Sequence, residues 1–237
     1  MRAWTYWCFL SSLVGVVYSE DVLDQPMSYE SLIADPWTDH VRSFHQLFQV
    51  QSVDNFLEFG MGRATHFFLK HCQNVTSIEL VVESRRKDVE PWYEKCNHAF
   101  SIYTHWCPSM HVFSARFDIA DQRAHEQLDP ATIDNTYLLE IDQLCDQVFC
   151  DQHFDLVFVD PGTHIRGDIV NALFNRADII AAHDTACTQH RMFGYYKVRC
   201  PDNYEEIVSK YGSGVTFWIN REKKELINEL KNRLSEF

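Results

Sequence analysis

Several short apolar segments of this sequence end in, or are closely followed by, an acidic residue or a histidine. In chain order these residues are Glu58, Glu79, Asp118 or Asp121, Asp160, His183 and Asp184. In an open parallel α/β sheet, ligands bind beyond the carboxyl ends of the strands. Each acid alone could cap a helix or face solvent in a loop. Taken together, they indicate a ligand site at one edge of a sheet.

A glycine turn follows the first of these segments. Residues 55–68 are typical of a buried strand, a turn built on Gly60 and Gly62, and the start of a helix. Two glycines let the backbone turn tightly and leave no side chain between it and a ligand. The free N–H groups at the start of a helix over residues 63–72 would point at such a ligand. The alternative is that this turn only connects the strand to the helix and binds no ligand.

Strands and helices are expected to alternate along most of the chain, which predicts a parallel sheet. The predicted strands are 56–59, 75–80, 110–115, 154–160 and 178–184, and the predicted helices are 63–72, 84–100 and 165–174. Residues 124–144 are ambiguous, because they fit an insertion or a helix with an extra short strand at 136–140.

The two ends of the chain differ from this pattern. Residues 29–50 have apolar residues at helical spacing, interrupted by Pro36, and predict two short helices that cover one edge of the sheet. Residues 204–210 and 215–220 predict two strands whose connecting turn is so short that they must be antiparallel. A final amphipathic helix is expected at 222–234.

Composition limits the classes of partner. The 237 residues carry 21 Lys and Arg against 34 Asp and Glu, a formal net charge of −13. Nucleic acids and anionic membrane surfaces are recognised through basic patches, so this balance argues against both as partners. The length suits one well-filled globular domain.

The first residues resemble a secretory signal. Arg2 precedes an apolar run at 4–17, and residues 17–19 fit a cleavage site before Glu20. We therefore expect a signal peptide at 1–19 and a single domain at 20–237. A short membrane anchor and a buried first helix are the alternatives. With cleavage the protein would be exported or secreted, without stable membrane insertion; otherwise it would be membrane-anchored or cytoplasmic.

Eight cysteines are present, and Cys8 would leave with the signal. In an exported protein the seven that are left are compatible with two or three disulfides. No Cys-x-x-Cys pair occurs, and the spacing from Cys145 to Cys150 is a poor one for a structural zinc site.

Four stretches together resemble the class I S-adenosylmethionine-dependent methyltransferases: residues 57–65, 77–80, 154–160 and 181–185. The resemblance implies an α/β fold with a Rossmann-like, doubly wound, mostly parallel seven-stranded sheet and an antiparallel C-terminal hairpin. It also implies S-adenosylmethionine as cofactor. Gly60 and Gly62 would approach its methionine portion, Glu58 its amino group, Glu79 its ribose hydroxyls and Asp118 its adenine.

The last two stretches are most similar to the metal-dependent O-methyltransferases of small molecules. In that branch, carboxylates at two neighbouring strand ends hold magnesium, which acidifies the hydroxyl of the acceptor. Asp160 and Asp184 match those positions and would be the metal ligands. His164 or His183 would take the proton, which gives Asp160, His164 and His183 as candidate catalytic residues.

Three functions are therefore weighed. The first is methyl transfer from S-adenosylmethionine to a small hydroxylated or carboxylated acceptor. The second is an exported, non-catalytic protein of the same fold that binds a partner or a nucleoside-like ligand, because S-adenosylmethionine is a cytosolic metabolite. The third is a nicotinamide-dependent dehydrogenase, which would want a third glycine where Ala64 and Thr65 stand.

Overall fold

The computed structural model describes residues 27–78, 110–112, 136–149, 152–161, 165–185 and 193–235. Several sequence predictions lie outside these residues: the signal peptide at 1–19, and the positions of Glu79, Asp118, Asp121 and His164. The helix expected at 84–100 also lies outside them.

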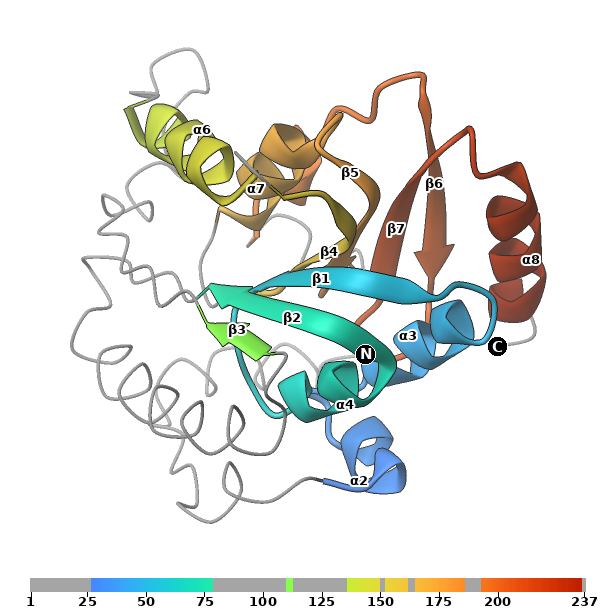
Figure 1. Ribbon diagram of the computed structural model, residues 1–237. Helices are drawn as coiled ribbons and strands as arrows, with labels where there is room; N and C mark the ends of the chain where they lie inside the picture. Colours follow the sequence, from blue (N-terminus) through green and yellow to red (C-terminus); the bar gives the residue numbers. More distant parts are fainter. Residues whose placement is uncertain are drawn as a thin grey trace, which may run out of the picture.

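A seven-stranded sheet forms the centre of the molecule, in the order β3-β2-β1-β4-β5-β7-β6 (Figure 1). The strands are β1 Val53–Phe59, β2 Cys72–Ile78, β3 Met110–Val112, β4 Phe154–Val159, β5 Ala177–His183, β6 Tyr204–Ser209 and β7 Val215–Asn220. Strands β1 to β5 pair in parallel, and β7 pairs antiparallel with both β5 and β6. The predicted doubly wound sheet and its C-terminal hairpin are thereby confirmed.

Helices cover both faces of this sheet (Figure 1). Their bounds are α2 Tyr29–Ala34, α3 Val41–Phe48, α4 Thr65–His71, α6 Thr136–Phe149, α7 Arg166–Leu173 and α8 Lys224–Ser235, with a short 3₁₀ helix, η5, at Tyr195–Lys197. Side chains of α6, α7 and η5 share one buried apolar cluster with the sheet, and those of α2, α3, α4 and α8 share the other.

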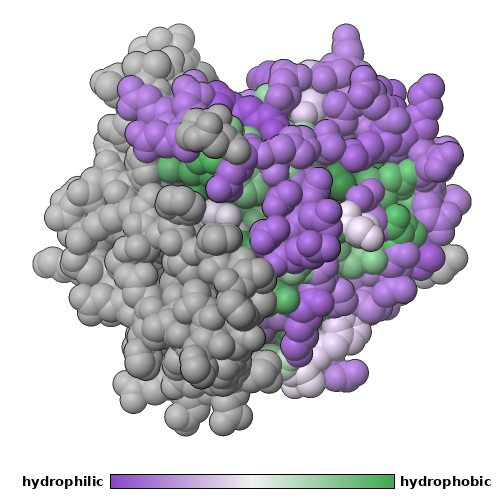
Figure 2. Space-filling model, viewed as in Figure 1, coloured by the Kyte–Doolittle hydropathy of each residue, from purple (hydrophilic) through white to green (hydrophobic). Residues whose placement is uncertain are grey.

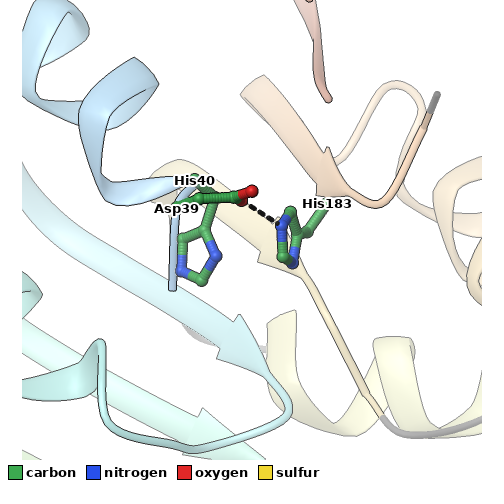
Figure 3. Close-up of side chains that lie close together, drawn as sticks. All are labelled: Asp39, His40 and His183. Atoms are coloured by element: carbon green, nitrogen blue, oxygen red, sulfur yellow. Dashed lines mark hydrogen bonds and ion pairs between the residues drawn. The ribbon is translucent and has the colours of Figure 1, made fainter. Parts of the chain in front are cut away.

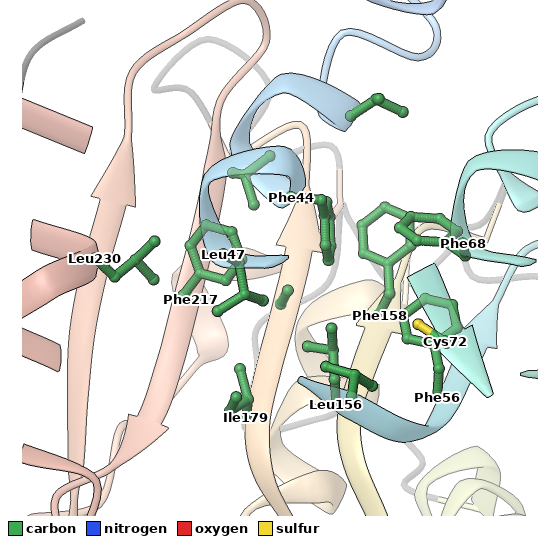
Figure 4. Packing of buried hydrophobic residues seen from close by; sticks show 14 of the residues in the cluster. Phe44, Leu47, Phe56, Phe68, Cys72, Leu156, Phe158, Ile179, Phe217 and Leu230 are labelled. Carbon is green, nitrogen blue, oxygen red and sulfur yellow. The ribbon is translucent and has the colours of Figure 1, made fainter. Parts of the chain in front are cut away.

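Alternation along the strands explains the two clusters. Successive side chains of a strand point to opposite faces. In β4, Val157 and Val159 face α6 and α7, whereas Leu156 and Phe158 face the other layer. Figure 4 shows this second cluster, in which side chains of α3, α4 and α8 pack against those of β1, β4, β5 and β7. Central strands buried on both faces need the near-continuous apolar runs seen in the sequence.

Three local predictions differ from the structure in detail. The helix predicted at 63–72 is observed at Thr65–His71, and Cys72 already begins β2, so strand two starts earlier than expected. The short strand considered at 136–140 is part of a continuous helix, α6, which buries Ile141 and Leu144 on one side. The N-terminal helices cover a face of the sheet, not its edge, because Phe44 and its neighbours reach the buried cluster.

Hydrophilic side chains dominate the described surface in the view of Figure 2, with hydrophobic residues showing between them. No helix in the described ranges is long and apolar enough to cross a membrane. Among the described cysteines, Cys72, Cys145 and Cys200 are free thiols.

Candidate functional site

The glycine turn lies where the order of the strands reverses. From β1 the chain proceeds outward through β2 and β3 and then returns to β4 on the other side of β1. This reversal is the usual place for a ligand in a doubly wound sheet. The Gly60 N–H donates to the Ile78 carbonyl at 2.7 Å, and the Asp160 N–H donates to the Phe59 carbonyl at 2.8 Å. Backbone hydrogen bonds thus tie the turn to both neighbouring strands.

The two glycines of the turn have different surroundings. Gly60 has a φ of +93°, and a Cβ at this position would lie 2.4 Å from the carbonyl oxygen of Asp160. Gly62 faces open space, because no described atom would lie within 4 Å of a Cβ built there. Gly60 is therefore required by the packing of the turn on β4, and Gly62 is the position that leaves room for a ligand.

Glu58 fixes the turn through hydrogen bonds to its buried carboxylate. Its side chain is 1% exposed, and its Oε1 accepts hydrogen bonds from the hydroxyls of Thr65, at 2.8 Å, and Ser77. The Thr65 hydroxyl in turn accepts from the Gly62 N–H at 3.2 Å. This chain of hydrogen bonds links the buried carboxylate to the open glycine, so Glu58 fixes the position of the backbone that would face a ligand.

Asp160 and Asp184, the predicted metal ligands, do lie together at the ends of β4 and β5. The space between them is taken by Arg166, whose Nη1 lies 2.7 Å from Asp160 Oδ1 and 2.9 Å from Asp184 Oδ2. The guanidinium also donates from Nε to the carbonyl of Pro161 at 2.8 Å and lies over the ring of Phe193. The Arg166 side chain is 6% exposed.

Arg166 competes with magnesium for these carboxylates. Mg²⁺ requires an octahedron of oxygen ligands close to the ion, and Asp160 Oδ1 and Asp184 Oδ2 already accept from one nitrogen of Arg166. A second cation at the same place would be repelled by the fixed guanidinium. Although burial alone would raise the pKa of Asp160, Arg166 and then His183 lower it to about 2. Asp160 and Asp184 thus form an ion pair with Arg166, and together with His183 they also place three potential ligand atoms within 4.8 Å of one another, so the metal site stays a prediction.

His183 lies between the carboxylates of Asp39 and Asp160. Figure 3 shows its contact with Asp39. Its Nε2 is 2.9 Å from Asp39 Oδ1, and its Nδ1 is 3.3 Å from Asp160 Oδ2. Burial alone would lower the pKa of His183, but the charge of Asp160 and the hydrogen bonds to both acids raise it to about 10. The raised pKa favours the protonated imidazolium, and the role of His183 as the catalytic base stays a prediction.

Three residues of this site were missed by sequence reasoning: Asp39, Arg166 and Ser213. The Ser213 N–H donates to Asp39 Oδ2 at 3.0 Å, and its hydroxyl lies 2.6 Å from His183 Nε2. For Arg166 a signal did exist, because a cation in the first turn of a helix opposes the helix dipole and calls for an acidic partner. Neither Asp39 nor Ser213 stands in a pattern that distinguishes it from other loop residues.

Known proteins resemble this chain in fold and not in sequence. No protein-family model matches the chain, and no curated protein is significantly similar to it in sequence. A solved structure from Staphylococcus aureus, provisionally described as a caffeoyl-CoA O-methyltransferase, matches with a TM-score of 0.53 and 13% identity over 91% of this chain and 98% of that one. The chain therefore has the fold of the class I methyltransferases.

Two further solved structures are similar at lower TM-scores. An O-methyltransferase from Bacillus cereus in complex with SAH has a TM-score of 0.47 and 13% identity, over 90% of this chain and 97% of that one. The O-methyltransferase TomG from Streptomyces achromogenes in complex with SAM has a TM-score of 0.47 and 12% identity, over 91% and 96%.

Proposed function

We propose that this protein transfers a methyl group from S-adenosylmethionine to a small hydroxylated or carboxylated acceptor. The observation that carries the proposal is the open glycine turn at the strand reversal, where Gly62 leaves room for a ligand and Glu58 fixes the backbone beneath it. The fold supports the same reaction class. The net charge of −13 favours a small acceptor over a nucleic acid.

The roles of the residues follow from this placement. The backbone at Gly62 would face the methionine portion of the cofactor, and Glu58 would act on it through Thr65. Glu79 follows directly after β2 in sequence, where a carboxylate can accept hydrogen bonds from two ribose hydroxyls. Asp118 is the corresponding candidate beside the adenine. These assignments are part of the proposal.

A lone pair of the acceptor oxygen forms the new bond to the methyl carbon while the carbon–sulfur bond breaks, and its electrons stay on the sulfur. The acceptor proton leaves to a base or to water, and His164 is the candidate base carried over from the sequence. The ion pair with Arg166 helps to hold the pKa of Asp160 at about 2, so this carboxylate does not compete for that proton.

Calorimetric titration of the full chain with S-adenosylmethionine tests the proposal. We expect micromolar binding that weakens at least tenfold, about 1.4 kcal/mol, in Glu79→Ala. Glu222→Ala, which alters an exposed glutamate, is the matched control and should bind like the wild type. Failure of a folded wild-type sample to bind would overturn the proposal.

One observation favours the second function, an exported, non-catalytic protein of the same fold. The charged groups described at the ends of β4 and β5 are paired with one another, as in a structural network. Titration and an acceptor screen together separate the two functions. A repurposed fold would either fail to bind S-adenosylmethionine or bind it without methylating any acceptor in a screen of phenols and carboxylic acids.

A further inference from the structure

His40 is a buried histidine whose ring is left unpaired by the residues that the structure describes. It precedes α3, is 2% exposed, and makes no side-chain cap to that helix. Within the described part of the chain, neither of its ring nitrogens has a hydrogen-bond partner. A buried polar group left in this state costs free energy, so such groups call for an explanation. Burial lowers the pKa of His40 to about 3, which keeps the ring neutral with a lone pair available.

The ring lies against the Asp39–His183 pair (Figure 3). The centroids of the two imidazole rings are 4.4 Å apart. One potential ligand atom from each of Asp39, His40 and His183 lies within 4.8 Å of the others, and all three residues are buried. Two ligands on one zinc ion are at most about 4.4 Å apart, twice the usual bond length, so small side-chain rotations would bring the three atoms onto one ion.

The charge around these residues also suits a dication. Asp39, Asp160 and Asp184 contribute three negative charges, and Arg166 contributes one positive charge. With His183 neutral, the cluster therefore carries a net charge of −2. A proton on His183 neutralises half of this charge, whereas a divalent ion neutralises all of it.

We propose that Asp39, His40 and His183 form a binding site for a divalent transition metal ion of the zinc class. Two imidazole nitrogens and one carboxylate are ligands typical of Zn²⁺ and its neighbours, in contrast to the all-oxygen set that magnesium requires. On binding, the ion takes the place of the proton on His183 Nε2, and that proton passes to solvent. Ser213 Oγ, 2.6 Å from the same nitrogen, or a water completes the coordination.

The surroundings of the site match those of known zinc histidines. A ligating histidine usually donates its other N–H to a carboxylate, and His183 Nδ1 faces Asp160 Oδ2 at 3.3 Å. The Ser213 N–H fixes the second oxygen of Asp39 at 3.0 Å. The ion would join the start of α3, the end of β5 and the turn between β6 and β7. This site goes beyond the proposed methyl transfer and does not depend on it.

Metal titration of the full chain, stripped with a chelator, tests the site. We expect about one equivalent of Zn²⁺ by calorimetry, release of protons to the buffer, and a visible spectrum typical of nitrogen and oxygen ligands when Co²⁺ is used in its place. His40→Phe keeps an aromatic ring in the cluster and should weaken binding at least tenfold. His153→Gln, at an exposed histidine, should leave binding unchanged.

Three results would overturn the site. The first is a folded wild-type chain that takes up no Zn²⁺. The second is binding that His40→Phe leaves intact, and the third is a Co²⁺ spectrum dominated by thiolate charge transfer, since either would place the metal on other residues. Thermal unfolding of the wild type gives a readout independent of any variant, because a bound ion must raise its Tm as the Zn²⁺ concentration rises.

Discussion

Two arginines at opposite ends of α7 make the same kind of contact in different surroundings. Arg166 begins the helix, is 6% exposed and bridges Asp160 and Asp184 at 2.7 and 2.9 Å. Arg176 follows the helix, is 27% exposed and lies 2.5 Å from Asp146. Its second acid, Asp142, is 3.9 Å away, and both acids are more than half exposed.

The difference shows that burial, not the number of ion pairs, decides how much a charge cluster contributes to the free energy of unfolding. An ion pair at the surface contributes little to stability, because water and salt screen the attraction between its charges. At the carboxyl end of the sheet the charges are largely shielded from water, so removing one partner leaves the others poorly compensated. That end of the sheet therefore holds a fixed network, and the opposite end of α7 holds ordinary surface charge.

Removal of Arg166 should have the largest effect. Arg166→Met would leave Asp160 and Asp184 close together without a counter-charge, and we expect a loss of about 3–5 kcal/mol in the free energy of unfolding. Urea denaturation measures this loss. A loss below about 1 kcal/mol would mean that the buried end behaves like the surface, and the comparison would fail.

The glycine turn gives the next largest effect at the same end of the sheet. Gly60→Ala would place a Cβ against the Asp160 backbone at positive φ, and we expect a loss of about 2–4 kcal/mol. Gly62→Ala is the matched control, because its Cβ meets no described atom. Equal losses in urea denaturation for the two variants would contradict the division of roles between these glycines.

A conservative change at Arg166 sharpens the comparison. Arg166→Lys keeps the charge but loses the planar fork that contacts two acids and the Pro161 carbonyl at once. We expect a loss of about 1–2 kcal/mol, near the lower value of a single hydrogen bond to a charged group. Full retention of stability in thermal and urea unfolding would show that charge alone is sufficient.

The smallest effect is expected at the other end of the helix. Arg176→Met should change the free energy of unfolding by less than about 1 kcal/mol, and added salt should reduce the difference further. Measurement at low and high salt checks both statements. A loss as large as that of Arg166→Met would remove the distinction on which the account rests.

Much of the fold could be predicted, because local sequence determines it. β4 and β5 were predicted to within one residue at each end, since strands buried on both faces need long apolar runs. α6 was not predicted cleanly, because the polar residues between Ile141 and Leu144 obscure its period.

The site was predictable only in part. Strand ends located Glu58, Asp160 and Asp184 at one edge, because topology alone brings parallel carboxyl ends together. The contact between Ser213 and Asp39 joins residues 174 positions apart and depends on how the N-terminal helices pack. The position of Arg166 between the two acids depends on the orientation of α7. No local sequence pattern specifies that orientation.

The central claim is that S-adenosylmethionine binds at the carboxyl end of the sheet. A titration with this ligand tests the claim most directly. It would compare the wild type, Gly62→Val and Arg176→Met, each in magnesium and in chelator. The account predicts binding by the wild type that is indifferent to magnesium, unchanged in Arg176→Met and at least tenfold weaker in Gly62→Val, whose side chain enters the open space. Absence of binding by the folded wild type, or undiminished binding by folded Gly62→Val, would contradict it.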